Sequence, residues 1–175
     1  MEPLYQKLAR HPRWRQDTPI TQPDSSAPLK SLVIDRGSLT AALIALSAGT
    51  FEVNVLRQYL ATPFVHEQRK MGRPTNLVAG VREVELHVHG EAVVFARSIM
   101  PLAVANNGQG GLGKLGQTPL GHLLFKNGRI RVSKRQFADV DLDGERYHAR
   151  RTPYDYRQTQ ILVSEFFLPQ IQKYL

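Results

Sequence analysis

Two side chains of opposite charge, Arg82 and Glu165, fall on strand faces that are otherwise apolar. Side chains alternate across a β-strand, so in the run VREVELHV Arg82 shares one face with Val84 and Leu86. In the run QILVSEFF, Glu165 shares a face with Val163 and two further large apolar residues. A buried charge is costly unless it is paired or meets a ligand, so both positions require an explanation.

Two interpretations of these charges remain open at this point. In the structural interpretation, Arg82 and Glu165 form a buried salt bridge or reach solvent at strand ends, and alternation alone favours it because structural ion pairs give the same pattern. In the functional interpretation, both charges face a closed pocket. The arginine would then hold a carboxylate by two parallel hydrogen bonds, and the glutamate would accept from a hydroxyl or act as a base.

Three further arginines are weaker candidates for the same pocket. Arg97 shares its strand face with Val93 and Phe95, so it is a third charge on an apolar face. Arg150 and Arg151 are adjacent and must point to opposite faces, so at most one of them can enter a pocket.

Histidines offer no convincing metal site. His87 and His89 would share a strand face as a metal pair does, but Glu83 and Glu85 lie on that face too, and we expect it to be the solvated side of the sheet. The chain has no cysteine, which excludes disulfides, thiolate ligands and thiol nucleophiles. We therefore expect no metal and no cofactor.

The composition indicates one soluble domain. A chain of 175 residues is long enough for one core, and no apolar run approaches the roughly 20 residues that span a bilayer. With no secretory signal at the start and no cysteine, we expect a cytoplasmic protein without membrane insertion. The formal charge of +8 permits nucleic acid or a small anion as partner, but no nucleic-acid-binding motif accompanies it. We expect no nucleic-acid partner.

The first 30 residues differ in pattern from the rest. Residues 17–28 are rich in Pro, Ser and Thr and have no apolar period, which is typical of a tether, and a peripheral helix is expected before them. We therefore divide the chain into an N-terminal helix and tether, residues 1–30, and a main domain, residues 31–175, to which the resemblance described below assigns the catalytic function.

The remaining elements indicate an antiparallel sheet. Ser38 is a candidate N-cap for a short helix, and TPLGHLLF at residues 118–125 predicts another, while the stretch 66–79 is polar and loop-like. Six strands are expected, and the second and third form a hairpin through Gly90 and Glu91. They begin near residues 51, 81, 92, 129, 145 and 160. Short connections between strands favour an α+β fold over a parallel one.

Six motifs, in order along the chain, resemble those of the chorismate pyruvate-lyases. The motifs are GSLT at 37–40, VREVELHV at 81–88, ARSIMP at 96–101, KLGQTPLGHLLF at 114–125, ARRT at 149–152 and SEFFLP at 164–169. The resemblance covers residues 37–169 and leaves the N-terminal 30 residues outside. Its most specific element is the LG-x-TPLG-x-x-LF stretch.

The resemblance implies an enzyme that converts chorismate into 4-hydroxybenzoate and pyruvate, a carbon-oxygen lyase of ubiquinone, plastoquinone or related aromatic biosynthesis. It implies a six-stranded antiparallel sheet whose ligand lies beneath two helical flaps. By motif match, Arg82 binds the ring carboxylate together with the backbone N–H groups of Leu39 and Leu120, and Glu165 meets the hydroxyl. Arg97 would meet the second carboxylate or support Glu165.

A ligand-binding module is the main alternative. A related fold serves as the effector-binding domain of some bacterial transcription regulators, so a non-catalytic sensor of small carboxylates is possible on the same scaffold. The region before Ser38 is too short and too Pro-rich for a winged helix-turn-helix, which argues against a complete regulator. We expect a monomer whose partners are chorismate and 4-hydroxybenzoate.

Overall fold

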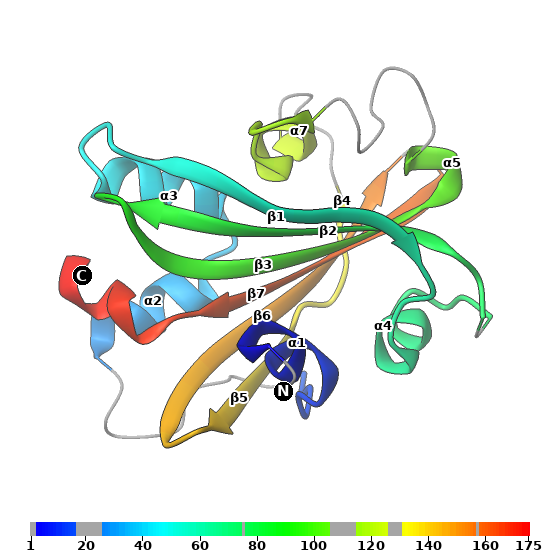
Figure 1. Cartoon of the computed structure of the whole chain (residues 1–175), viewed down its shortest axis with the longest axis horizontal. Helices are drawn as coiled ribbons and strands as arrows, with labels where there is room; N and C mark the ends of the chain where they lie inside the picture. The colour runs from blue at the N-terminus through cyan, green and yellow to red at the C-terminus, as the bar shows by residue number, and fades with distance from the viewer. Residues whose placement is uncertain (1–2, 17–25, 75, 106–114, 126–130, 157) are drawn as a thin grey trace.

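A single antiparallel sheet organises the chain (Figure 1). The computed structural model describes residues 3–16, 26–74, 76–105, 115–125, 131–156 and 158–175. Seven strands form the sheet, with β1-β2-β3-β7-β6-β4 as the hydrogen-bonded order and β5 paired to β6 beside this path. Their bounds are β1 Glu52–Ala61, β2 Ala79–Val88, β3 Glu91–Pro101, β4 Arg131–Val132, β5 Gln136–Leu142, β6 Glu145–Tyr156 and β7 Thr159–Phe167.

The expected α+β class with an antiparallel sheet is confirmed, with one strand more than the six expected. The extra strand arises because the run expected to start at residue 129 is divided: β4 pairs with the end of β6 at Tyr154 and Asp155, and β5 pairs with its first part. Residues 133–135 between them belong to no strand. Arg135 lies in this break, and its contacts are described below.

The β2–β3 hairpin turns one residue earlier than expected. Its two loop residues are His89 and Gly90, with φ of 51° and 76°. Positive φ at both central positions matches the twist of the flanking strands, which explains why this pair makes a tight connection.

Helices cover both faces of the sheet, and α3 and α7 lie on the side opposite α1 and α4 (Figure 1). The helices are α1 Leu4–Arg10, α2 Ala27–Ile34, α3 Leu39–Leu46, α4 Val65–Lys70, α5 Leu102–Ala105, α7 Leu120–Phe125 and the 3-10 helix η1 Pro169–Tyr174. No helix in the described part of the chain has the length and apolar character needed to cross a bilayer.

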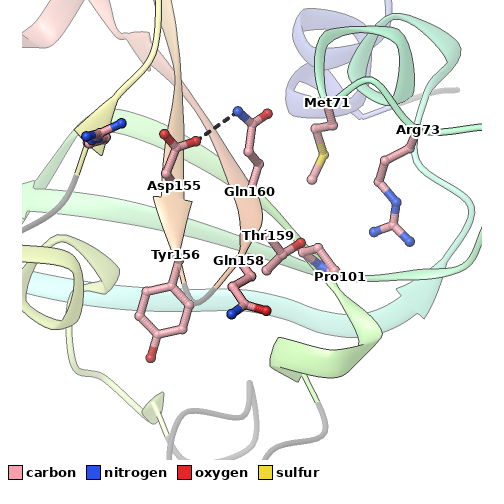
Figure 2. A pocket seen from close by; sticks show the side chains of 9 residues that line it. Met71, Arg73, Pro101, Asp155, Tyr156, Gln158, Thr159 and Gln160 are labelled. Carbon is pink, nitrogen blue, oxygen red and sulfur yellow. Dashed lines mark hydrogen bonds between the residues drawn. The ribbon is translucent and has the colours of Figure 1, made fainter.

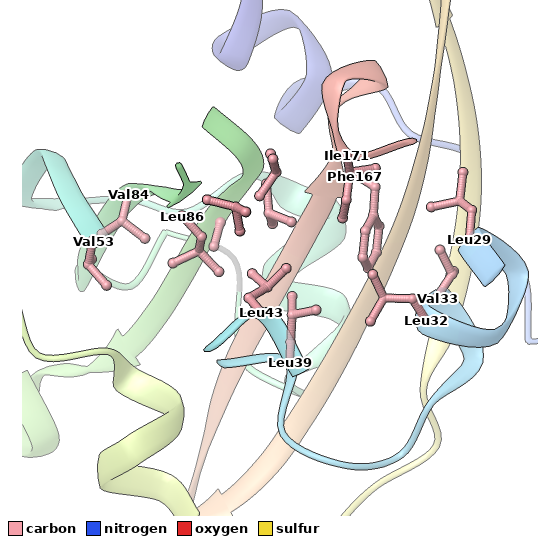
Figure 3. Packing of buried hydrophobic residues seen from close by; sticks show 14 residues of the cluster. Leu29, Leu32, Val33, Leu39, Leu43, Val53, Val84, Leu86, Phe167 and Ile171 are labelled. Carbon is pink, nitrogen blue, oxygen red and sulfur yellow. The ribbon is translucent and has the colours of Figure 1, made fainter. Parts of the chain in front are cut away.

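One hydrophobic cluster joins α2 and α3 to the sheet (Figure 3). Leu39 and Leu43 of α3 belong to it together with Leu86 of β2 and Phe167 of β7, all at most 6% exposed. Alternation along β2 therefore directs the apolar set, and Arg82 with it, toward this side.

On the other face of the sheet, the structure differs from two expectations. Glu83, expected on a solvated face, is only 1% exposed: Gln6 of α1 donates to its Oε1 at 2.9 Å, and Arg97 joins it to Glu67 of α4. Tyr5 of α1 stacks on Phe95 with ring centroids 4.4 Å apart, and Leu8 is fully buried. The segment expected to be a polar loop contains α4, in which Glu67 is buried.

The N-terminal region packs onto the same sheet. α2 was not expected, although Ser26 accepts a hydrogen bond from the Leu29 amide as an N-cap and Pro28 stands in the first turn. The proposed boundary between residues 30 and 31 falls inside this helix. Residues 17–25 of the expected tether lie outside the described residues.

Candidate active site

A small cavity of about 50 Å³ lies between α3, α7 and the sheet. Arg82 and Glu165, the two charges singled out in the sequence, both line it. The rest of its wall is mainly apolar and includes Val84, Leu86 and Leu124. The cavity thus brings the two buried charges to one enclosed space.

Arg82 pairs only with neutral groups among the described residues. Its Nη1 donates to Oε1 of Gln58 at 2.9 Å, and its Nη2 donates to the carbonyl oxygens of Gly116 at 2.8 Å and Thr118 at 3.2 Å. The side chain is 2% exposed, no carboxylate among the described residues pairs with it, and burial lowers its pKa. A buried guanidinium without a counter-charge favours an anionic ligand.

Two helix N-termini close the cavity. Leu39 and Leu120 both line it, and each is the first residue of its helix, so the helix offers no acceptor to its N–H. Ser38 caps α3 by accepting from the Ala41 amide. The helices approach closely, because a Cβ at Gly121 would lie 3.0 Å from Oγ1 of Thr40. The two short helices expected as flaps are therefore present over the cavity.

Glu165 pairs with Arg150 and not with Arg82. Nε of Arg150 donates to Oε2 of Glu165 at 2.5 Å, so the Arg82–Glu165 salt bridge of the structural interpretation does not form. Nη1 of Arg150 donates to the carbonyl oxygens of Leu32, Val33 and Asp35, at 3.0, 3.2 and 2.9 Å. Arg150 therefore fixes Glu165 to the C-terminal end of α2.

Arg97 lies on the other side of the sheet from the cavity. Its Nε and Nη2 donate to the two carboxylate oxygens of Glu67, at 2.8 and 3.1 Å, and its Nη1 donates to Glu83 at 2.5 Å. Burial opposes the charge of Arg97, but the hydrogen bonds to Glu67 raise its pKa on balance. The expectation that Arg97 meets a carboxylate of the ligand or supports Glu165 does not fit this placement. Support for Glu165 comes from Arg150 instead.

Arg151 points away from Arg150, as alternation requires. Its Nε donates to Gln136 at 2.8 Å, its guanidinium lies 4.6 Å from the ring centre of Trp14, and burial lowers its pKa to about 10. Only Arg150 of this pair contacts a residue that lines the cavity.

A larger hollow of about 660 Å³ lies at another part of the fold (Figure 2). Its wall includes Arg73, Asp155 and Gln160, and the last two are joined by a 3.0 Å hydrogen bond. It contains neither Arg82 nor Glu165. The small cavity remains the candidate site because it holds a buried cation that no carboxylate of the described segments neutralises.

Two polar residues of the cavity were missed in the sequence. Ser98 and Tyr154 both line it, and both are at most 5% exposed. Burial raises the pKa of Tyr154, and the nearby charge of Glu165 raises it further. Alternation was a usable signal for both, since Ser98 shares the face of Ala96 on β3 and Tyr154 shares the face of Arg150 on β6.

Comparison with known proteins shows which family the chain is similar to. The family described as chorismate lyase matches residues 8–174, which extends the similarity well before residue 37. A probable chorismate pyruvate-lyase of Aromatoleum aromaticum is 37% identical, over 86% of this chain and 89% of that protein. One of Methylococcus capsulatus is 34% identical, over 82% of this chain and 96% of that protein.

Solved structures share the fold at low sequence identity. The effector domain of PhnF from Mycobacterium smegmatis matches with a TM-score of 0.56 and 14% identity, over 78% of this chain and 91% of that one. This likeness concerns the fold alone. Because the family match and the relatives span most of its length, the chain belongs to the chorismate lyase family.

Proposed function

We propose that this chain converts chorismate into 4-hydroxybenzoate and pyruvate in the cavity beneath α3 and α7. The observation that carries the assignment is the buried Arg82, which has no acidic partner among the described residues and shares a closed cavity with Glu165. Membership of the chorismate lyase family supports the reaction.

Arg82 binds the ring carboxylate in this proposal. The carboxylate supplies the missing counter-charge, and the guanidinium offers it hydrogen bonds at a buried position where charge-assisted pairs are strong. The backbone N–H groups of Leu39 and Leu120, at the first residues of their helices, donate to the same carboxylate. Because only the backbone is used, different side chains are compatible with these two positions.

Glu165 accepts a hydrogen bond from the ring hydroxyl at the other end of the ligand. Its Oε2 is held by Arg150, and within the described residues its Oε1 has no donor, so that oxygen can accept from a ligand. The arrangement orients the ring between a cation and an acceptor, which lowers the entropic part of the barrier.

The reaction breaks the ether bond between the ring and the enolpyruvyl group. The ring carbon that bears the hydroxyl loses its proton, the C–H electron pair completes the aromatic ring, and the ether oxygen becomes the carbonyl of pyruvate. In one route Glu165 takes this proton and returns it to the methylene carbon of the departing group; in the other it passes directly to that carbon. Both routes need the ring to be held as described, and neither requires another reactant.

The test is an ultraviolet assay with chorismate and no added metal, following both products over the uncatalysed background. Equal amounts of 4-hydroxybenzoate and pyruvate are expected. If folded protein binds 4-hydroxybenzoate without turnover, the chain is a sensor and the proposal fails.

Arg82→Gln tests the site itself. Removing one partner of a buried charged pair costs about 2–5 kcal/mol, so the Kd for 4-hydroxybenzoate should rise roughly 30-fold or more. Arg131→Gln is the control, because Arg131 is exposed and lies away from the cavity on β4. Equal affinities in the two variants would exclude Arg82 as the carboxylate site.

A further inference from the structure

Besides Arg82, a second group of side chains with excess positive charge lies next to Glu165. Arg135, in the break between β4 and β5, donates from Nε to Oγ1 of Thr152 at 2.8 Å and from Nη1 to the carbonyl oxygen of Asp35. Arg150 donates to the same carbonyl oxygen. Two guanidinium groups thus meet at one acceptor, and Glu165 is the one carboxylate among the described residues that pairs with either.

One nitrogen of Arg135 has no hydrogen-bond partner in the described part of the chain. Its Nη2 is buried and makes no hydrogen bond within the described residues. An orphaned charged donor is expensive to bury, and the neighbouring charge of Arg150 adds to the cost. Burial and, after it, that neighbouring charge lower the pKa of Arg135.

Tyr154 links this position to the cavity. It lines the cavity, and along β6 it shares a face with Thr152, the residue that accepts from Nε of Arg135. Because Arg135 also shares the Asp35 carbonyl oxygen with Arg150, the partner of Glu165, it lies next to the Glu165 end of the cavity.

The excess positive charges at the two ends of the cavity match a ligand that carries two negative charges. Arg82 lacks a counter-charge at one end, and the Arg135, Arg150 and Glu165 group carries one excess positive charge at the other. Chorismate carries one carboxylate on its ring and a second on the enolpyruvyl group, whose ether carbon is next to the carbon that bears the hydroxyl. A hydroxyl at Glu165 brings the second carboxylate to the same end.

We propose that Nη2 of Arg135 binds the enolpyruvyl carboxylate, the carboxylate that leaves as pyruvate. This rests on the proposed orientation of the ring between Arg82 and Glu165. 4-Hydroxybenzoate lacks the second carboxylate, so Arg135 distinguishes substrate from product, whereas Arg82 and Glu165 contact both.

The experiment compares Arg135→Gln with Arg82→Gln, measuring kcat/KM for chorismate and the Kd for 4-hydroxybenzoate. Loss of a hydrogen bond between charged groups should lower kcat/KM of the Arg135 variant roughly 10- to 150-fold, with the product Kd within about threefold of the parent. Arg82→Gln should impair both quantities. Arg135→Lys, which keeps the charge, should recover part of the loss.

A merely structural role predicts another result. If Arg135 only steadied Asp35 and Arg150, its loss would disturb Glu165, and binding of the product hydroxyl would weaken together with turnover. That outcome, or an unchanged kcat/KM, overturns the proposal. An unmodified protein that never turns over chorismate would instead overturn the proposed function.

A chorismate analogue with a neutral amide in place of the enolpyruvyl carboxylate gives a test that does not depend on the variant folding. The parent protein should use it roughly 10- to 150-fold less efficiently than chorismate. Equal efficiency with both compounds overturns the proposal. In the Arg135→Gln variant, replacing the carboxylate of chorismate by the amide should lower kcat/KM little further, because the variant already lacks the interaction with this carboxylate.

Discussion

Replacing Arg97 by methionine should destabilise the protein strongly and leave the cavity intact. The substitution removes the cation that neutralises Glu67 and Glu83, each 1% exposed. Glu83 keeps Arg57 at 2.7 Å and Gln6 at 2.9 Å, so its charge remains partly compensated.

Glu67 loses more of its charge compensation than Glu83 does. After the substitution its described hydrogen bond is the one from the Phe64 amide, at 2.8 Å. Breaking a buried ion pair from one side costs about 3–5 kcal/mol. For a chain of this size that corresponds to a fall in Tm of roughly 6–20 °C.

The assay combines thermal unfolding with product binding. Below the Tm of the variant, the Kd for 4-hydroxybenzoate should stay within about threefold of the parent value, since the sheet separates Arg97 from the ligand. Arg57→Met is the control: its guanidinium contacts Glu83 from a half-exposed side chain, so its loss should cost about 0–1 kcal/mol. An Arg97 variant that keeps its Tm but loses product affinity would refute the placement of Arg97.

Three further outcomes are expected. Gly121→Ala places a Cβ 3.0 Å from Oγ1 of Thr40, so 4-hydroxybenzoate should dissociate several-fold faster, and Thr40→Ala in the same chain should reverse the change; stopped-flow release measures both. Ser38→Ala removes the N-cap of α3 and should destabilise that helix by about 1 kcal/mol, visible as faster amide exchange there with little change elsewhere. Glu165→Gln should lower kcat by roughly 10²–10⁴ if Glu165 is the base, and a smaller loss measured in the same assay supports internal proton transfer.

Alternation along strands predicted much of the site. β2 and β7 are regular through Arg82 and Glu165, so period-two counting placed both side chains on the cavity face correctly. Counting also placed Arg97 on the face of Phe95 correctly, but not on that of Val93, because the irregularity between Ala92 and Val94 turns Val93 into the cluster on the opposite face. It could not tell which face of the sheet bears the cavity. That depends on which helices cover each face.

Partners were harder to predict than faces. Glu165 pairs with Arg150 because β6 lies beside β7, with these two residues opposite each other in the register. Strand order is a long-range property that no local pattern in the sequence records. The missed helices have a different cause: α4 has only six residues, and in α2 the Ser and Pro that begin the helix resemble a continuing loop.

The hydrogen bonds from Arg150 to the end of α2 connect the first part of the chain to the cavity. Arg150 contacts carbonyl groups that precede it by 115 to 118 residues. A protein truncated before residue 36 would retain every strand of the sheet and both helices over the cavity, yet Glu165 would lose the anchor of its partner. The segment before the first strand therefore decides how the Glu165 carboxylate is oriented in the cavity.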